Sequence, residues 1–286
     1  MNPTGKRIQQ VAAVIAAAWA AGCSSARTVD EYIRTAGTGA QPRSYACRAT
    51  SEAPTIDGKL DDPVWQAAPW TEEFVDIEGA KKAKPAFRTH AKMVWNADAL
   101  FIAAELEEPH VRGTLKLHDA IVFHDPDFEV FIDPNGDCRD YFEIEVNPLG
   151  TIFDLLLKRT YRDGGPAIHA WNVEGLKVAI HVSGTLNNPA DTDKGWSVEM
   201  AIPWKSLADL AGSACPPRDR DVWRFGFSRV EWPTRVVDGG YETPAGSRED
   251  NWVWSPQGVV DMHRPERWGY VVFEEGTKAM RHEGTK

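Results

Sequence analysis

The chain has 286 residues and carries 42 acidic against 32 basic side chains, which gives a formal net charge of -10. An acidic chain without clustered lysine and arginine argues against nucleic acid as a partner, because phosphate binding needs concentrated positive charge. The same balance argues against polyanionic ligands.

The first 22 residues have the organisation of a secretory signal. Two basic residues precede an alanine-rich apolar run at 11–21, which is shorter than the roughly 20 residues that a membrane-spanning helix needs. The run ends in AAGCS, which is typical of a bacterial lipobox, although an ordinary signal peptide with a chance cysteine is the alternative. We therefore expect a secreted protein that acylated Cys23 anchors in the lipid bilayer of the cell envelope, or of the outer membrane in a Gram-negative cell.

Composition divides the rest of the chain into a tether, one domain and a tail. Residues 23–42 are rich in Ala, Gly, Ser, Thr and Arg and have no apolar periodicity, which indicates a flexible tether. Residues 43–276 contain no second linker and no internal repeat, and their length suits one large β domain. We expect residues 277–286 to form a disordered tail.

Most of the domain has the pattern of short strands. Nine segments rich in Val, Ile, Phe, Tyr and Trp are separated by turn residues: 87–95, 100–107, 128–133, 141–146, 152–158, 176–182, 196–202, 222–230 and 268–273. In FEIEVN, at 142–147, apolar and polar residues alternate as in a half-buried antiparallel sheet. Helical signal is limited to 63–68 and 203–211. The pattern predicts an all-β fold, an antiparallel β-sandwich or jelly roll.

Three cysteines fall within the predicted domain, namely Cys47, Cys138 and Cys215. Their spacing matches no zinc-binding pattern. In an oxidising compartment one pair can form a disulfide and leave one thiol free, and the sequence does not indicate which pair.

The segment DPNGD, at 133–137, is a candidate calcium loop. Asp133, Asn135 and Asp137 place oxygen ligands at i, i+2 and i+4, and the glycine between them permits a tight turn. No glutamate follows at the EF-hand interval, which excludes an EF-hand. A hairpin turn without metal is the alternative. We expect no required cofactor, and a calcium ion in this loop would be structural.

Six motifs resemble one known family in their chain order. Residues 55–65 read TIDGKLDDPVW and are similar to the opening motif I-D-G-x-[LI]-D-[DE]-x-x-W of the family 9 carbohydrate-binding modules. The further matches are WNADALFIA at 95–103, DFEVFID at 127–133, YFEIEVN at 141–147, GWSVEMAIPW at 195–204, and WSP followed by HRPERWG at 254–269. The resemblance implies a jelly-roll sandwich, of the kind attached to xylanases and related hydrolases, that binds sugars without cleaving them.

The family clamps a sugar ring between two aromatic side chains, commonly at a chain end. The resemblance places Phe123 at one clamp position, shortly before the segment 127–133. It places Met262 and His263 at the other, so neither tryptophan of the family is present. Outside the motifs, Trp171 and Trp232 stand in loop segments and are candidates for a replacement aromatic platform.

The family's polar contacts come from neighbouring strands. Glu129 matches the strand glutamate and Asn147 matches an asparagine of the adjacent strand. Two residues earlier, Glu145 stands where sugar binders can carry an arginine. Carboxylates and amides can each hold two sugar hydroxyl groups, so all three residues are candidate sugar contacts.

The resulting hypothesis is a surface lipoprotein that binds oligo- or polysaccharide and supports its degradation or uptake, with glycoside hydrolases as candidate partners. The runner-up is a structural or protein-interaction sandwich that has lost the sugar site. Catalysis ranks third, because pairs of carboxylates arise by chance among 42 acidic residues and no catalytic domain fits. Related sandwiches also bind haem between a methionine and a histidine. The candidates for that role are Met93, Met200, Met262, His90, His118, His124 and His181.

Overall fold

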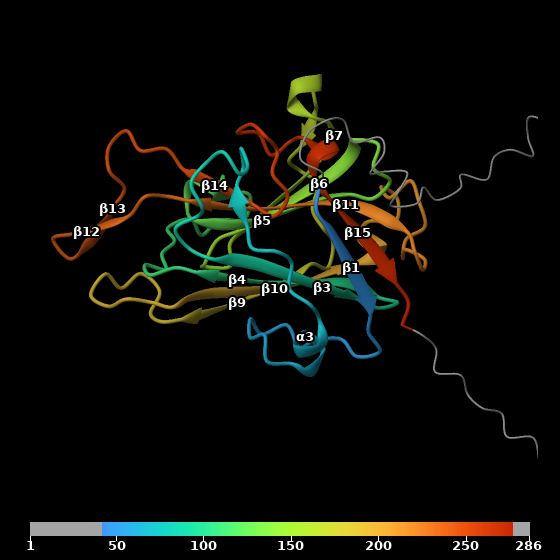
Figure 1. Cartoon of the computed structure of the whole chain (residues 1–286), viewed down its shortest axis with the longest axis horizontal. Coiled ribbons are helices and arrows are strands. Elements are labelled where there is room, and N and C mark those ends of the chain that lie inside the picture. Colours follow the sequence, from blue (N-terminus) through green and yellow to red (C-terminus); the bar gives the residue numbers. More distant parts are fainter. Residues whose placement is uncertain (1–41, 277–286) are drawn as a thin grey trace, which may run out of the picture.

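The computed structural model describes residues 42–276, and most of its regular structure is strand (Figure 1). The single α-helix of this part is α3 (Pro63–Ala67), and four 3₁₀ turns are η1 (Val122–His124), η2 (Tyr161–Asp163), η3 (Trp204–Ser206) and η4 (Pro265–Arg267). The strands are β1 (Ser44–Ala49), β2 (Val75–Asp76), β3 (Thr89–Trp95), β4 (Ala99–Glu107), β5 (Asp127–Asp133), β6 (Arg139–Val146), β7 (Ile152–Arg159), β8 (Ala167–Ile168), β9 (Lys177–Ser183), β10 (Gly195–Pro203), β11 (Val222–Glu231), β12 (Arg235–Val237), β13 (Gly240–Glu242), β14 (Asp250–Val253) and β15 (Gly269–Glu274). All nine predicted strands are present.

One sheet runs through both layers of the fold. Its order is β8-β7-β6-β5-β11-β15-β1-β3-β4-β10-β9, and β14 pairs with β11 and β2. The sheet curls so that the β5–β7 part faces the β3, β4, β9 and β10 part, as Figure 1 shows. The predicted sandwich is therefore confirmed, but it is not purely antiparallel. β1 inserts between β15 and β3 and runs parallel to both.

The core fills the space between the two layers. Alternate residues of the strands point into it, because successive side chains of a strand face opposite sides of the sheet. Both layers contribute to one apolar cluster, which includes Met93, Ile102, Val198, Met200, Phe128, Val130, Phe142, Ile144 and Phe227. Each such side chain stabilises the fold by about 1.5–3 kcal/mol when it is fully buried. His90 precedes Met93 by three positions on β3 and so faces the other side of the sheet, where it stacks on Trp70.

Two of the sequence motifs meet at one buried carboxylate. Glu199 on β10 accepts hydrogen bonds from the Trp65 indole Nε1 at 2.6 Å and from the backbone N–H groups of Asp57 at 3.0 Å and Gly58 at 2.6 Å. Gly58 has a left-handed φ of 87° and packs against the β9 backbone at Ile180, where no side chain fits. The opening motif is thus held to the outer face of β10.

Several predictions fall on the chain ends. The signal at 1–22, Cys23, almost all of the tether and the tail at 277–286 lie outside the described residues. Within residues 42–276 no helix has the length and apolar character that a membrane crossing requires.

The three described cysteines are free thiols, so none of the pairings that the sequence left open is present. Cys47 is enclosed in the core on β1, and Cys138 follows the turn after β5. Cys215 lies in the loop after η3, where its Sγ donates to the Trp204 carbonyl at 3.4 Å. Only Cys47 of the three lies on a strand of the sheet.

Candidate functional site

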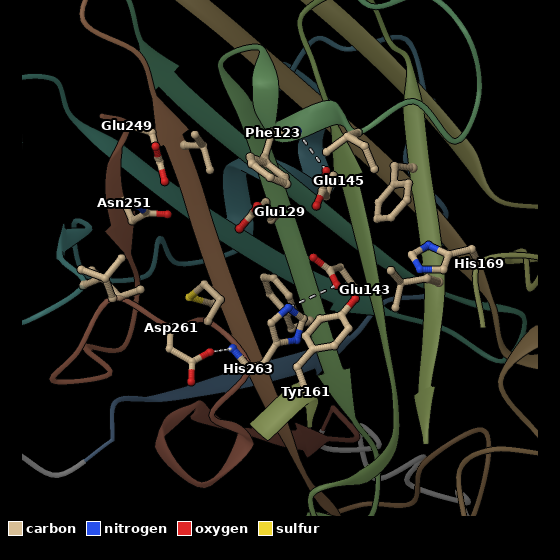
Figure 2. Close-up of a pocket in the computed structure, with 18 residues that line it drawn as sticks. Phe123, Glu129, Glu143, Glu145, Tyr161, His169, Glu249, Asn251, Asp261 and His263 are labelled. Carbon is tan, nitrogen blue, oxygen red and sulfur yellow. Dashed lines mark hydrogen bonds and ion pairs between the residues drawn. The ribbon is translucent and has the colours of Figure 1, made fainter. Parts of the chain in front are cut away.

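A cavity of about 310 Å³ lies on the face of β5–β7 that points away from the core (Figure 2). Its aromatic lining residues are Phe123, Phe131, Phe153 and Tyr161, and its acidic ones are Glu129, Glu143, Glu145, Glu249 and Asp261. Met262, His263, His169 and Asn251 complete its polar and polarizable lining. A cavity with apolar walls and a few converging polar groups is the usual form of a small-molecule site.

Strand alternation and register bring the central glutamates together. Phe128, Val130 and Ile132 of β5 point into the core, so Glu129 points to the outer face of the sheet. The register pairs Glu129 with Glu145 of β6, and Glu143 stands two positions along the same face. Three carboxyl groups on two adjacent strands therefore form the middle of the cavity.

Burial governs the charge of these glutamates. Loss of solvent, and after it the neighbouring charge of Glu129, raises the pKa of Glu143 to about 8. Burial and the charge of Glu145 likewise raise the pKa of Glu129. Burial raises the pKa of Glu145 as well, and its neighbour Glu143 adds to the shift through charge and a shared hydrogen bond. Near neutral pH the cluster thus holds protons, and its members can both donate and accept hydrogen bonds.

A fourth carboxyl, Asp127, lies beside this cluster and is fully buried. Its Oδ1 accepts from the Val230 N–H at 3.2 Å, whereas its Oδ2 has no hydrogen-bond partner among residues 42–276. Burial, followed by the charges of Glu129 and Glu145, raises the pKa of Asp127.

Exposed rings flank the glutamates on two sides. Phe123, in η1, is 37% exposed, and the Glu145 carboxylate accepts from its backbone N–H at 3.1 Å. Tyr161, in η2, is 51% exposed. In Figure 2, Phe123 lies at one end of the row of glutamates and Tyr161 at the other. The Thr160 side chain caps η2 by accepting from the Asp163 N–H at 3.2 Å, and this cap holds the turn that carries Tyr161.

His263 supports the Tyr161 end of the cavity. Its ring contacts the Tyr161 ring edge to face, with centroids 4.6 Å apart, and its Nδ1 lies 3.1 Å from the Tyr141 hydroxyl. Burial lowers the pKa of His263 to about 4, so the imidazole is neutral at neutral pH. Its Nε2 is 3.9 Å from Glu143 Oε2.

The cavity brings together five of the eight residues predicted as sugar contacts: Phe123, Glu129, Glu145, Met262 and His263. The other three, Asn147, Trp171 and Trp232, do not line it. Asn147 is fully buried, and its side chain makes hydrogen bonds within the chain. Its Nδ2 donates to Asp125 and to the Leu115 carbonyl, both at 2.9 Å, and its Oδ1 accepts from the backbone N–H of Thr151.

The two tryptophans outside the cavity also have packing roles. Trp171 contacts the core ring of Phe142, with centroids 5.6 Å apart. Trp232 donates from its Nε1 to the Phe123 carbonyl at 2.8 Å, so it supports the Phe123 turn from behind. Neither ring is a wall of this cavity.

The predicted calcium loop is closed by its own hydrogen bonds. The Asp133 carboxylate accepts from the backbone N–H groups of Gly136 at 2.9 Å and Cys138 at 2.8 Å. Asn135 Oδ1 accepts from the Asp137 N–H, and Asn135 Nδ2 donates to the Asp137 carboxylate. The three predicted ligands are therefore close together, but their oxygens point to donors within the turn.

Two other groups within residues 42–276 place three candidate metal ligands within 4.8 Å of one another. One consists of Asp127, Glu129 and Glu145, and it belongs to the cavity. The other consists of His118, Asp119 and Asp154.

The sequence analysis did not identify the remaining lining residues. Strand alternation could have identified Glu143, because it places Glu143 on the same face as Glu145. Tyr161 follows β7 in the segment TYRDGG, whose threonine, aspartate and glycines are a turn signal. Glu249, Asn251 and Asp261 come from the segment around β14 and reach the cavity only through the tertiary fold.

Comparisons with known proteins agree with this architecture. A family model described as "Carbohydrate family 9 binding domain-like" matches residues 56–275. Among curated proteins, exoglucanase XynX of Acetivibrio thermocellus is 25% identical over 160 residues, which are 56% of this chain and 12% of the relative. The chain thus matches about an eighth of that relative's length.

Solved structures share the fold. A carbohydrate-binding module of family 9 from Caldicellulosiruptor kristjanssonii, in complex with cellotriose, superposes with a TM-score of 0.53 at 15% identity, covering 82% of this chain and 96% of that module. The same organism's module in complex with glucose gives a TM-score of 0.54 at 16% identity and covers 82% of this chain and 99% of the module. At these identities the likeness establishes the fold.

Proposed function

The chain belongs to the carbohydrate family 9 binding domain-like family, and we propose that its β5–β7 cavity binds the end of an oligo- or polysaccharide without cleaving it. The observation that carries the proposal is the row of Glu129, Glu143 and Glu145 between two exposed aromatic rings. The glucose and cellotriose complexes of the structural relatives name the class of ligand to be tested.

The chemistry of the cavity suits a sugar ring. A pyranose has apolar C–H faces and a rim of hydroxyl groups. The exposed rings of Phe123 and Tyr161 can cover the C–H surface, and the glutamates can each hold a pair of neighbouring hydroxyls. In this proposal Tyr161 takes the second clamp position, while Met262 and His263 lie beneath it as the floor. The cavity volume is at the small end for ligand sites, which favours one or two rings over a long segment.

Removal of a wall or of a central glutamate is expected to abolish most of the sugar affinity. We expect sub-millimolar binding to at least one oligosaccharide in a calorimetric panel that includes cellotriose, glucose and xylo-oligosaccharides. Phe123→Ala should weaken it by about tenfold or more because it deletes an apolar face, and Glu129→Ala should do the same because it deletes a carboxyl group that holds sugar hydroxyls.

The matched control is Glu105→Ala, which removes an exposed glutamate of β4 outside the cavity. Its affinity should equal that of the unaltered protein. Equal affinity of Phe123→Ala and Glu129→Ala with the unaltered protein would place any sugar site elsewhere. If the folded protein binds no sugar of the panel, the result would favour the alternative of a structural or protein-interaction sandwich that has lost the sugar site.

We further propose that acylated Cys23 anchors this sandwich to the cell envelope, beside hydrolases or transporters that act on the same glycan. The lipobox and the preceding apolar run support this proposal. Cells that express the unaltered chain should incorporate a clickable palmitate analogue into it and retain it in the membrane fraction. Cys23→Ser should lose the label and release the protein, and labelling of that variant would contradict the proposal.

Calcium at the 133–137 loop stays a prediction. Binding would require Asp133 to turn oxygens away from the backbone N–H groups of Gly136 and Cys138. The calorimetric panel is therefore run with and without calcium.

A further inference from the structure

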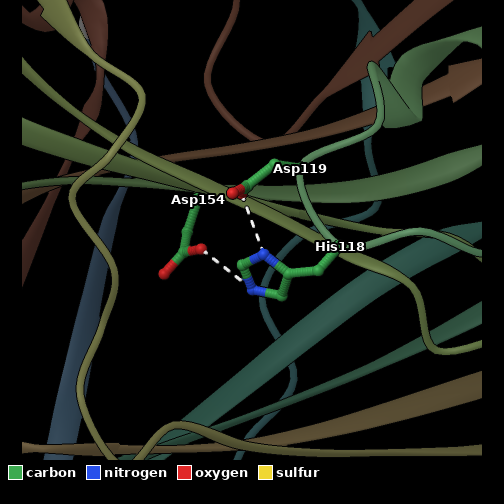
Figure 3. A group of neighbouring side chains, drawn as sticks. All are labelled: His118, Asp119 and Asp154. Carbon is green, nitrogen blue, oxygen red and sulfur yellow. Dashed lines mark ion pairs between the residues drawn. The ribbon is translucent and has the colours of Figure 1, made fainter.

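A second polar cluster lies on the opposite face of β7 from the sugar cavity (Figure 3). Asp154 extends from β7 toward the core side, whereas Phe153 and Leu155 face the cavity. His118 and Asp119 come from the loop that precedes η1. This loop is attached to β7, because the Asp119 N–H donates to the Ile152 carbonyl at 3.0 Å.

The histidine ring is held between two carboxylates. Its Nδ1 lies 3.0 Å from Asp119 Oδ1, and its Nε2 lies 3.4 Å from Asp154 Oδ1. A neutral imidazole has one N–H, so it can donate to only one of them. The shorter distance favours Nδ1, beside the Asp119 carboxylate, as the nitrogen that carries this proton. The lone pair of Nε2 then faces a carboxylate oxygen.

Asp154 has a carboxylate oxygen that accepts no hydrogen bond from residues 42–276. The residue is 2% exposed, and its Oδ2 accepts from the Val173 N–H at 2.6 Å. Its Oδ1 is buried and accepts no hydrogen bond from any residue in 42–276. A buried unpaired carboxylate oxygen is costly. It faces the imidazole of His118, whose side chain is 50% exposed.

From this geometry we propose that His118 Nε2 and Asp154 Oδ1 coordinate a divalent transition metal ion of the zinc class. Bonds of about 2.0–2.1 Å to nitrogen and to oxygen at a tetrahedral angle separate the two ligand atoms by about 3.4 Å. The observed separation is 3.4 Å. Asp119 acts as the outer carboxylate that orients a metal-binding histidine through its other nitrogen. Water molecules complete the coordination on the exposed side.

Such an ion would fasten the loop before η1 to β7. The loop leads directly into Phe123, one wall of the sugar cavity, so the metal would stiffen that wall from behind. The residues of the metal site do not line the sugar cavity, so the metal site does not depend on sugar binding. An imidazole ligand favours zinc over magnesium or calcium.

The test is calorimetric titration of the untagged protein with Zn²⁺, followed by thermal unfolding with and without the ion. We expect one micromolar site and a higher Tm with zinc, because an ion that binds only the folded state stabilises it. Mg²⁺ at the same concentration should leave the Tm unchanged. His118→Ala and Asp154→Asn should each weaken Zn²⁺ binding by about tenfold or more, and Asp119→Asn by about tenfold.

The substitutions separate coordination from folding. Asp154→Asn keeps an oxygen to accept from the Val173 N–H but replaces the metal-facing oxygen by an amide nitrogen, which is not a ligand. His181→Ala removes a histidine of β9 outside the cluster and should bind zinc as the unaltered protein does. Unchanged Zn²⁺ affinity in both His118→Ala and Asp154→Asn, or no micromolar binding by the unaltered protein, would overturn the site.

Discussion

Arg229→Ala is expected to lower the free energy of unfolding by about 3–5 kcal/mol, the cost of removing one partner from a buried ion pair. The Arg229 side chain is 1% exposed on β11, and its Nη2 donates to Glu108 at 2.8 Å and to Glu231 at 2.7 Å. Its Nη1 donates to Thr89 at 3.0 Å and to the Glu107 carbonyl at 2.8 Å.

These contacts join the two layers of the sandwich. Thr89 belongs to β3 and Glu107 to β4, whereas Arg229 belongs to β11 of the opposite layer. The guanidinium also lies 5.1 Å from the ring centroid of Trp252. Without the arginine, the carboxyl groups of Glu108 and Glu231 are left buried without the hydrogen bonds that it donates.

The loss in the free energy of unfolding is measured by urea unfolding, which far-UV circular dichroism monitors. Arg235→Ala is the matched control, because its exposed guanidinium pairs with Glu242 at 3.0 Å on the β12–β13 hairpin. Exposed pairs contribute about 0–1 kcal/mol, so this variant should unfold close to the unaltered protein. Equal unfolding midpoints for the two variants would contradict the assignment of Arg229 as the link between layers.

Glu143→Gln is expected to stabilise the protein at alkaline pH by up to about 5 kcal/mol and to leave its stability nearly unchanged near pH 4.5. Burial raises the pKa of Glu143 from 4.5 to about 8, and each pKa unit corresponds to about 1.4 kcal/mol. The folded state therefore holds a proton that the unfolded state has already released between these two values.

The direction of the pH dependence follows from proton binding. Below about pH 4.5 the Glu143 carboxyl is protonated in both the folded and the unfolded state. The contribution of this protonated carboxyl to the stability of the fold is then fully present. As the pH rises toward about 8, the folded state binds more protons than the unfolded state, so stability falls. A glutamine at position 143 carries no charge at any pH, so the variant does not lose this stability as the pH rises.

Urea unfolding from pH 4.5 to pH 8.5 compares the unaltered protein, Glu143→Gln and the exposed control Glu174→Gln. The control should follow the unaltered protein throughout. A Glu143→Gln variant that is less stable at pH 8.5 than the unaltered protein would mean that the Glu143 carboxylate is stabilised in the fold, in conflict with its buried acidic surroundings.

The sequence predicted the centre of the site because the centre lies on regular strands. The resemblance to the family 9 modules identified Glu129 and Glu145 by their positions in the motifs, and the strand register places the two residues opposite each other. Asn147 does not line the cavity because its amide folds back on the following turn, where its Oδ1 accepts from the Thr151 N–H. A local side-chain-to-backbone bond of this kind competes with ligand contact at a strand end.

The periphery of the site could not be predicted in the same way. Tyr161 reaches the cavity through the capped turn after β7, and Asp261 approaches from a loop about a hundred residues later in the chain. The parallel insertion of β1 between β15 and β3 is also a long-range event, which local periodicity does not encode.

A crystal structure of the protein with the tightest-binding oligosaccharide of the panel tests the central claim most directly. We predict density for a terminal sugar ring between Phe123 and Tyr161, with hydroxyl groups within hydrogen-bond distance of Glu129, Glu143 or Glu145. Sugar bound on the outer face of β4, β9 and β10, in the separate cavity lined by Glu105, His181 and Trp196, would contradict the proposed site.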